Sequence, residues 1–513
     1  MAKRTERAAL RVREMRVIWR DTFIVESATP KSGKRIDFLE TSRDRLTRLP
    51  SYVCDRFTRR HDQTDLLRII ERASRNVARI GYDSLVRYQF QPFQMTDLRP
   101  TLSRLRCGPE ALKPEDITEA ALEARKLNAW IEITPMLVLH RAGVGIMEYL
   151  ASFTHGDGYL VDEAIEMVRL GISTQLLALP ETWARQLPQN IEDWAVHSMV
   201  SVAPDWNLVA AGLRDISQIV AGYLEQEPDG HQERAINELE ELPNRPTGSA
   251  TVVIVATEPM AGGEIAQFVK DNASALRGIG AMDTYFRERA GWIVERELGD
   301  NLSVDNEAAV YLLGNSELVL FNDQLPPIAA ATRQRLGVPD ERLVVTYLYY
   351  HYQVLMEWSY FQDAILRAYI NRLDILATTE KPARAQMIAT MQGALKDLVQ
   401  YQENITPYAT RIEFLEKVRD YHKLDELSER FEHKQELLLN YFSEYHGYRE
   451  ARAAEFLNLL AAIIAGTSLA AFVTTLLGVQ PGANPTQTAI YVGVNLVAVA
   501  IVLIVLWVRQ RYV

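Results

Sequence analysis

Two uncharged stretches near the C-terminal end decide the fold that the sequence predicts. They read FLNLLAAIIAGTSLAAFVTTLL at 456–477 and TAIYVGVNLVAVAIVLIVLWV at 488–508, which are 22 and 21 residues without a charged side chain. As helices they would rise about 31–33 Å, enough to cross a hydrocarbon core of about 30 Å. The sequence therefore predicts a transmembrane hairpin over 456–513, and a pair of buried core helices is the alternative interpretation.

Basic residues flank this hairpin at both of its outer ends. Arg449 and Arg452 precede the first span, Arg509 and Arg511 follow the second, and the connecting loop at 478–487 carries no charge. Because loops rich in Lys and Arg stay on the cytoplasmic side of a membrane, both termini are predicted to be cytoplasmic. The chain is thus expected to be a multi-pass protein of a bacterial inner membrane, in contact with the lipid bilayer.

The composition of the whole chain is that of a globular protein and limits its partners. The 513 residues include 56 Lys and Arg against 67 Asp and Glu, which gives a formal net charge of −11. An acidic balance argues against a nucleic-acid partner, since phosphate backbones attract basic surfaces. The two cysteines, Cys54 and Cys107, are too few for a disulfide scaffold or a cysteine-based zinc site.

Residues 1–342 have the pattern of a mixed α/β cytoplasmic domain. Gly143 and Gly145 supply a permissive backbone between two strand-like runs, which favours a hairpin closed by the turn-forming residues at 154–159. The basic opening at 3–20 is interpreted as a solvated helix or tail, with contact to anionic lipid or a targeting role as alternatives. Helices are predicted at 64–80 and 110–127, and strands at 129–141, 144–153, 251–257 and 316–321.

Residues 343–455 have the pattern of a helical stalk. Long helices are predicted at 343–376 and 381–402, and a third begins near Thr406 and meets no helix breaker until Gly447. The apolar residues of the third helix recur at spacings of three and four, which marks one packed stripe. A single helix of this length cannot bury such a stripe alone, so companion helices or a coiled coil between copies of the chain are expected.

The sequence contains no recognisable set of catalytic residues. The protein is therefore predicted not to be an enzyme, with no catalytic residues and no cofactor. The segment SGKR at 32–35 lacks the first Gly and the final Ser or Thr of a P-loop. Gly262 and Gly263 are interpreted as a strand-to-helix joint rather than an anion nest. His155 and Asp157 are interpreted as part of a hydrated turn rather than a metal site.

Carboxylates are frequent on the third stalk helix, and two interpretations stay open. They form a solvated face paired with neighbouring Lys and Arg residues, or some of them meet at a subunit interface and bind divalent cations through oxygen atoms. The sequence does not identify which residues would be metal ligands. The acidic residues are Glu413, Glu416, Asp420, Asp425, Glu426, Glu429, Glu432, Glu436 and Glu444.

Two spans per chain cannot enclose an aqueous path, so a pore would require a homo-oligomer. On a helix that turns about 100° per residue, one strip of the first span passes from apolar to small and hydroxylic side chains. Apolar rings gate by dewetting, and rings of oxygen atoms hold hydrated cations. The alternative is that small residues only allow close helix packing. The predicted pore-lining residues are Leu457, Ile464, Ser468, Ala471 and Thr475.

The order of these parts resembles that of the CorA-type divalent metal cation transporter family. The similarity covers the α/β domain, the long stalk helix, the two spans and the basic tail, and it is most specific over 406–513. In that family a Gly-Met-Asn tripeptide ends the first span, and here Gly478, Val479 and Gln480 stand at that place. Gly matches, Val replaces Met, and Gln keeps the amide on a side chain one methylene longer.

The resemblance implies both a fold class and a function. The fold class is an α/β cytoplasmic domain followed by a long helical stalk and a C-terminal two-helix transmembrane hairpin, assembled as a funnel-shaped homopentamer. The implied function is a cation channel or transporter, with magnesium, cobalt, nickel or zinc as substrate, gated by the cytoplasmic domain and selective at Gly478–Gln480. The alternative is a ligand-sensing membrane effector of bacterial signalling or defence that permeabilises or depolarises the membrane. A tail-anchored scaffold without a pore is a third interpretation.

Overall fold

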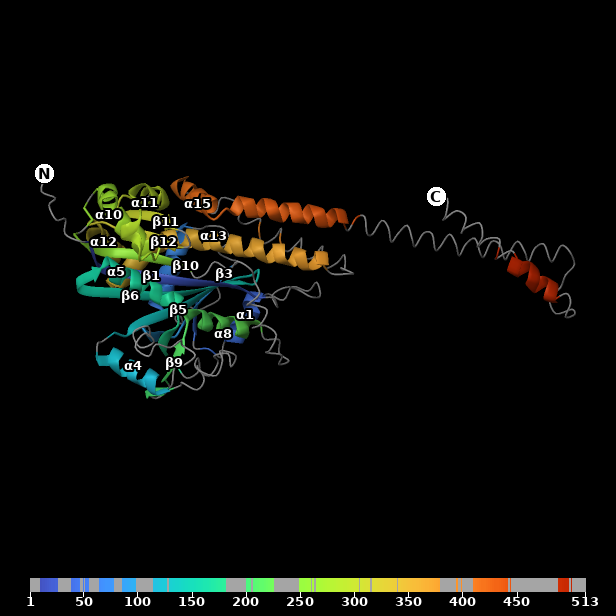
Figure 1. The fold of residues 1–513 in the computed structure, drawn as a ribbon, viewed down its shortest axis with the longest axis horizontal. Helices are drawn as coiled ribbons and strands as arrows, with labels where there is room; N and C mark the ends of the chain where they lie inside the picture. The colour runs from blue at the N-terminus through green and yellow to red at the C-terminus, as the bar shows by residue number, and fades with distance from the viewer. Residues whose placement is uncertain are drawn as a thin grey trace. The chain divides into compact units, whose positions relative to one another are not determined.

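The computed structural model of the chain describes most of the α/β body and parts of the helices that follow it (Figure 1). The chain divides into two compact units, Met1–Phe431 and Glu432–Val513. The described residues are 10–25, 38–46, 49, 51–54, 64–77, 85–97, 114–126, 129–180, 200–203, 206–225, 249–259, 261–262, 264–303, 305–313, 316–338, 340–378, 394, 398, 409–441, 443, 488–497 and 500.

The first unit is built on one 12-stranded sheet. Ten of the strands follow the order β11-β12-β10-β1-β6-β5-β4-β7-β9-β8. The other two lie off this path, where β3 pairs with β5 and β2 pairs with β3. The pair β10–β12 is parallel, and the other pairs are antiparallel. The strands are β1 Arg11–Ile24, β2 Ser51–Cys54, β3 Leu85–Phe90, β4 Phe93–Thr96, β5 Ile131–His140, β6 Val144–Leu160, β7 Gln175–Pro180, β8 Val200–Ala203, β9 Trp206–Ala211, β10 Ser249–Glu258, β11 Ala308–Leu313 and β12 Ser316–Phe321.

Helices cover both faces of this sheet. The α-helices are α1 Phe38–Leu46, α2 Asp65–Val77, α4 Pro114–Lys126, α5 Val161–Arg169, α8 Leu213–Glu225, α10 Ile265–Gly280, α11 Gly291–Leu298, α12 Leu325–Leu336, α13 Glu341–Thr378 and α15 Ala409–Tyr421. The described residues also include two 3-10 helices, η5 Leu170–Ile172 and η6 Phe286–Glu288, and helical residues at 424–441 and 488–497.

The central strand β1 shows which helices lie on which face, because successive side chains of a strand point to opposite sides. Trp19 donates a hydrogen bond from Nε1 to the Val168 carbonyl of α5 at 2.6 Å. The neighbouring Arg20 instead donates to Oε1 of Gln353 on α13 at 2.6 Å. The sheet thus separates a face with α5, α8 and α10 from a face with α13 and α2.

Apolar side chains fill the layer between the sheet and α5, α8 and α10. Val17, Trp19 and Phe23 of β1 are buried there with Ile165 of α5 and Ile216 of α8. Burial of apolar surface contributes roughly 25 cal/mol per Å², so this layer is the main source of cohesion for the face.

On the other face, α13 is packed almost all round its surface, and α15 runs beside it. Three ring pairs join α13 to α15 and the residues that follow it. The ring centroids of Tyr352 and Phe414 lie 5.6 Å apart, and those of Tyr360 and His422 lie 5.1 Å apart. The third pair, just beyond α15, is Tyr369 with Phe431 at 6.5 Å. The partner numbers rise together, so the two helical segments run parallel.

Several predicted elements are confirmed. The hairpin predicted at 129–153 corresponds to β5 and β6, which pair in register from Ile133 with Ala151 to His140 with Val144. The strands predicted at 251–257 and 316–321 correspond to β10 and β12, and the helices predicted at 64–80, 110–127 and 343–376 to α2, α4 and α13. The helix predicted at 381–402 lies outside the described residues except at 394 and 398.

Three local predictions are wrong. Over 11–20 the basic opening belongs to strand β1 rather than to a solvated helix or tail, and carboxylates of two distant strands neutralise its buried Arg20. The segment 154–159 continues β6 instead of closing a turn. The third stalk helix is interrupted at 422–423, where Lys423 has a φ of 54°.

The predicted transmembrane hairpin is also contradicted. Within the described ranges, no helix is long and apolar enough to cross a membrane. The span at 456–477 lies outside the described residues, and the span at 488–508 is described as helix only over 488–497 and at residue 500. The funnel-shaped fold class and the multi-pass membrane localisation are corrected accordingly, and what remains is a mixed α/β sheet domain with helices. The boundaries at 342/343 and 455/456 stay predictions.

Candidate ligand-binding site

The predicted selectivity loop and pore lining all lie outside the described residues. This holds for Gly478, Val479 and Gln480 and for Leu457, Ile464, Ser468, Ala471 and Thr475. Their geometry therefore stays a prediction.

Three of the described stalk carboxylates, Glu413, Asp425 and Glu426, lie in surface ion pairs. Glu413 pairs with Lys417 at 3.5 Å, and Asp425 pairs with Arg419 at 3.1 Å. Across the described part of the chain, no group of three or more His, Cys, Asp or Glu side chains could hold a metal ion. His155, the other metal candidate, packs its ring against Tyr159 at 5.1 Å on β6. The described residues thus fit the interpretation of a solvated, paired face.

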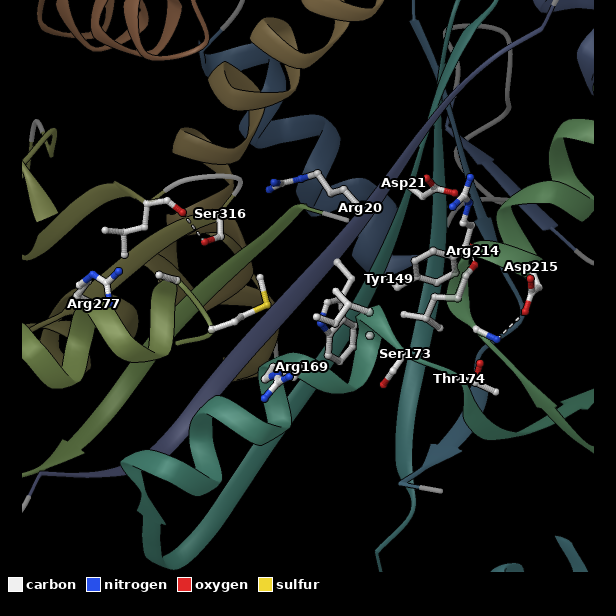
Figure 2. Close-up of a pocket in the computed structure, with 18 of the residues that line it drawn as sticks. Arg20, Asp21, Tyr149, Arg169, Ser173, Thr174, Arg214, Asp215, Arg277 and Ser316 are labelled. Carbon is white, nitrogen blue, oxygen red and sulfur yellow. Dashed lines mark hydrogen bonds between the residues drawn. The ribbon is translucent and has the colours of Figure 1, made fainter. Parts of the chain in front are cut away.

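A cavity of about 1100 Å³ opens beside β1 on the face of the sheet that carries α5, α8 and α10 (Figure 2). The segment after α5, the start of α8, the end of α10, the last residue of β11 and the first residue of β12 all contribute to its wall. Its lining includes Trp19, Asp21, Tyr149, Arg169, Arg214, Asp215, Arg277, Met282, Arg296, Glu297, Ser316 and Tyr421. A cavity of this volume accommodates a small organic ligand.

Two aromatic side chains form a rigid floor. The Trp19 indole is held by its bond to Val168, and a Cβ at Gly171 would overlap this ring, so glycine is required there. The Tyr149 hydroxyl donates to the Leu213 carbonyl at 2.7 Å and lies 2.8 Å from Oγ of Ser217. Burial raises the pKa of Tyr149 well above its usual value, so the phenol stays neutral and anchors α8.

Basic side chains outnumber acidic ones in the lining. The Arg20 guanidinium turns to the opposite face of the sheet, where it bonds to Gln353. Figure 2 shows Arg277 and Arg169 toward one end of the pocket and Arg214 with Asp21 and Asp215 toward the other. The arginines are Arg20, Arg169, Arg214, Arg277 and Arg296, and the acidic residues are Asp21, Asp215 and Glu297.

The arginines differ in how firmly they are held. Arg277 donates Nε to Glu297 at 2.6 Å and Nη1 to Asp283. Burial opposes ionisation of Asp283, but the bonds from Arg277, the Tyr285 amide and Arg289 outweigh it and lower the pKa of Asp283. Arg169 is instead 40% exposed and makes a single 3.3 Å contact with Glu166. Arg277 is therefore structural, whereas Arg169 can exchange a weak surface partner for a ligand.

The start of α8 is closed by a side chain. Oδ2 of Asp215 accepts a hydrogen bond from the Gly212 amide at 2.7 Å. Burial raises the pKa of Asp215, while the bond from Gly212 and the charge of Arg214 act in the opposite direction. The amide that precedes the helix is thereby satisfied, and the carboxylate of Asp215 is held at the start of α8.

Met282 lines the cavity in a conformation that L-residues rarely adopt. It follows α10 with a φ of 56°, and the Asp283 amide donates to the Gly278 carbonyl at 2.9 Å. The left-handed position after a helix usually holds glycine, and a side chain there costs about 1–2 kcal/mol. Strain of this kind tends to persist at functional sites, and here it places a thioether chain in the cavity wall.

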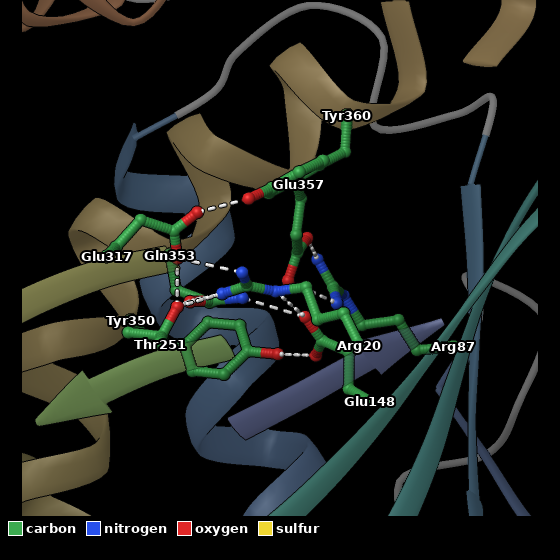
Figure 3. Close-up of polar contacts among 9 residues, drawn as sticks. All are labelled: Arg20, Arg87, Glu148, Thr251, Glu317, Tyr350, Gln353, Glu357 and Tyr360. Atoms are coloured by element: carbon green, nitrogen blue, oxygen red, sulfur yellow. Dashed lines mark hydrogen bonds and ion pairs between the residues drawn. The ribbon is translucent and has the colours of Figure 1, made fainter. Parts of the chain in front are cut away.

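A buried charge cluster lies on the other face of the same strands (Figure 3). Arg20 contacts Glu317 at 2.8 Å and Glu148 at 3.4 Å, and Arg87 forms a two-bond pair with Glu357 on α13. The side chains of these five residues are at most 4% exposed. The cluster ties β1, β3, β6 and β12 to α13.

Three carboxyl groups in this cluster face two guanidinium groups, and the pKa of one of them, Glu148, is raised. Burial and the charge of Glu357 raise this pKa, against the opposing effects of Arg20, Arg87 and the hydrogen bond from Tyr350. Tyr350 donates to Oε2 of Glu148 and Gln353 donates to Oε1, both at 2.8 Å. These bonds offset part of the cost of a buried charge at Glu148.

We expect a Glu148→Gln variant to lose less unfolding free energy than a Glu357→Gln variant, because burial and the charge of Glu357 disfavour the charge that the substitution removes. A folded-state pKa above the usual 4.5 makes the wild-type unfolding free energy fall as the pH rises above 4.5 through that folded value. The variant should lack this part of the pH dependence. Urea titrations at several pH values measure both effects.

Glu357→Gln is the matched control, since it leaves Arg87 without its carboxylate and should lose several kcal/mol. If Glu148→Gln proves as costly as Glu357→Gln, a raised pKa of Glu148 is contradicted.

Neither a protein-family model nor a curated protein matches the chain. The residues of the cavity therefore carry the functional argument themselves. Sequence reasoning missed this cavity because its lining is spread from Trp19 to Tyr421 without a shared motif. The left-handed residues Met282 and Lys423 also carry no local signal, since neither is a Gly or Asn.

Proposed function

We propose that the α/β body is a ligand-binding sensor domain that takes an amphipathic small anion in the cavity beside β1. The observation that carries this proposal is the convergence of arginines from α5, α8, α10 and α11 on a cavity of about 1100 Å³ with an aromatic floor. Guanidinium groups suit sulfonate, carboxylate and phosphate groups because they present several N–H donors in one plane. Cation transport stays a prediction from the family resemblance. The lack of enzymatic activity stays a prediction from the motifs of the sequence.

The apolar part of the lining defines the other half of the ligand. Ile172, Leu213, Leu313 and Met282 supply aliphatic surface close to the arginines. A ligand with a planar or aliphatic body and an anionic group at one end would use both kinds of contact. A strongly hydrated inorganic anion would leave the apolar wall unused.

Anilinonaphthalene sulfonate (ANS) is a suitable probe, because its apolar rings carry one anionic group and its fluorescence rises on binding. Phenylnaphthylamine has the same rings without the sulfonate and serves as the matched ligand. We expect the full-length protein to bind ANS more tightly than phenylnaphthylamine, and Arg169→Ala to weaken only ANS, by about tenfold. Loss of a hydrogen bond to a charged group costs about 1.5–3 kcal/mol, and the partial exposure of Arg169 places the effect at the lower end.

Two further variants separate the cavity from other surfaces. Arg13→Ala removes an exposed arginine paired with Glu258 outside the lining and should not change ANS binding. Met282→Gly should weaken both dyes while stabilising the fold, because it removes apolar wall and relieves the left-handed backbone. Equal ANS affinity in wild type, Arg169→Ala and Met282→Gly would refute the proposed function.

A further inference from the structure

The cavity touches a break in the long helical segment that follows α13. α15 ends at Tyr421, residues 422–423 form a turn, and helical structure resumes at Leu424. The Lys423 amide donates to the Asp420 carbonyl at 3.0 Å, and the Leu427 amide donates to the Lys423 carbonyl at 3.2 Å. The break is therefore a hydrogen-bonded joint with a defined geometry, which we call the α15 joint, Tyr421–Lys423.

One residue of the α15 joint lies in the ligand site. Tyr421 is part of the cavity lining, and its ring meets His422 edge-on at 5.5 Å with an angle of 88°. The His422 ring in turn packs on Tyr360 of α13 at 5.1 Å. A ligand that contacts Tyr421 therefore acts directly on the residue that begins the joint.

A second route leads from the joint back to the cavity. The Tyr360 hydroxyl donates to Oε1 of Glu317, and the Arg20 guanidinium lies 5.1 Å from the Tyr360 ring centroid. Ser316, which precedes Glu317, lines the cavity. The joint is thus connected to the cavity both through Tyr421 and through the first residues of β12.

Strained backbone occurs both in the cavity wall and at the α15 joint. Among the residues that the structure describes, Met282 and Lys423 are the non-glycine residues with a positive φ, at 56° and 54°. Met282 lines the cavity, and Lys423 lies two residues beyond the lining residue Tyr421. Such backbone conformations are disfavoured for L-residues and persist only where the surrounding structure holds them.

We propose that occupancy of the cavity sets the conformation of the α15 joint, so that the helical residues from Leu424 onward are the output of the ligand site. This regulation rests on the proposed function. A ligand shifts a two-state joint only by its differential affinity for the two states, and the contact with Tyr421 supplies that difference. The coupling is reciprocal, so a change that alters the joint must also alter ligand affinity.

Hydrogen exchange tests the effect of the ligand on the joint. The full-length protein is exchanged with and without saturating ANS, and the amides of 421–427 are compared with those of α12, which does not contribute to the lining. ANS should slow exchange at 421–427 at least threefold and leave the Gly337 amide, bonded to Arg333, unchanged. The slowing should disappear in Arg169→Ala at an ANS concentration that leaves this variant mainly unoccupied.

Substitution of Lys423 tests the reverse effect. Lys423→Val disfavours the left-handed backbone, so ANS affinity should fall at least threefold, whereas Lys423→Gly should bind ANS as tightly as the wild type or more tightly. Lys417→Val, on the exposed surface of α15, is the matched control and should not change the affinity. Lys423 is not part of the lining, so lost ligand contacts cannot explain a change.

The outcomes separate the two proposals. Arg169-dependent ANS binding with unchanged exchange at 421–427 would overturn the coupling and leave the sensor function standing. ANS binding that does not depend on Arg169 or Met282 would overturn the sensor function, and the coupling with it. Should Lys423→Val fail to fold, the exchange measurement on the wild type decides.

Discussion

An Arg20→Met variant should lose about 3–5 kcal/mol of unfolding free energy, because a buried carboxylate would be left without its cation. Arg20 donates to Glu317 at 2.8 Å and to Gln353 at 2.6 Å, and its side chain is 1% exposed. Burial disfavours the charge of Arg20, yet Glu317, Tyr360 and Glu148 raise its pKa above the usual value. Methionine keeps much of the length but supplies no donor. Urea unfolding followed by circular dichroism measures the loss.

Arg13→Met on the same strand is the matched control for this variant. Arg13 pairs with Glu258 at 2.6 Å, but the two side chains are 49% and 51% exposed. Exposed pairs contribute about 0.2–1 kcal/mol, so the control should differ little from the wild type. A loss in Arg20→Met no larger than in Arg13→Met would contradict the description of the cluster as a buried charge network.

Removing both partners of the Arg87–Glu357 pair should cost far less than removing one. Arg87→Leu leaves Glu357 buried without its cation and is expected to lose about 3–5 kcal/mol, while Arg87→Leu with Glu357→Leu should regain most of that loss. The double variant deletes one positive and one negative charge, so the net charge of the cluster does not change.

A double-mutant cycle measures this effect directly. Urea unfolding of the wild type, Arg87→Leu, Glu357→Leu and the double variant yields a coupling energy that should reach a few kcal/mol. Additive losses in the cycle would show that the two side chains do not compensate each other, and the pairing of β3 with α13 through Arg87 would be refuted.

These variants also concern the ligand site, because the cluster and the cavity share strands. Trp19 and Arg20 are neighbours on β1, one in the cavity floor and the other in the cluster. Ser316 and Glu317 are neighbours on β12, where Ser316 lines the cavity and Glu317 belongs to the cluster. A change in the cluster that shifts either strand is therefore expected to alter ligand affinity as well as stability.

Elements with a strong local pattern were predictable from the sequence. β5 and β6 are largely apolar runs on either side of Gly143, which has a φ of 81° in the turn, and β12 is a short, fully buried run. α13 has the apolar density and length of a packed helix. Each of these signals is contained within a few dozen residues, so the pattern alone indicates the element.

Other elements depended on partners that are remote along the chain. The basic residues of β1 resemble a solvated tail by themselves, and Arg20 is buried because Glu148 and Glu317 meet it from strands 128 and 297 residues away (148 − 20 and 317 − 20). The hairpin predicted at 456–513 rested on apolar length alone, and no membrane-spanning helix is found in the described part of the chain. The joint at Lys423 has no breaker residue, so its position depends on tertiary contacts.

The sequence by itself determined the class of the body, its long helix α13 and the hairpin that lies next to β1, because periodic burial is recorded in neighbouring residues. Only the tertiary structure decided which arginines are neutralised inside the protein and which line the cavity. Arg20 and Arg169 look alike as sequence, yet one is enclosed by carboxylates and the other stays 40% exposed at the ligand site. The difference arises from the faces of the sheet on which distant segments pack, which no local pattern encodes.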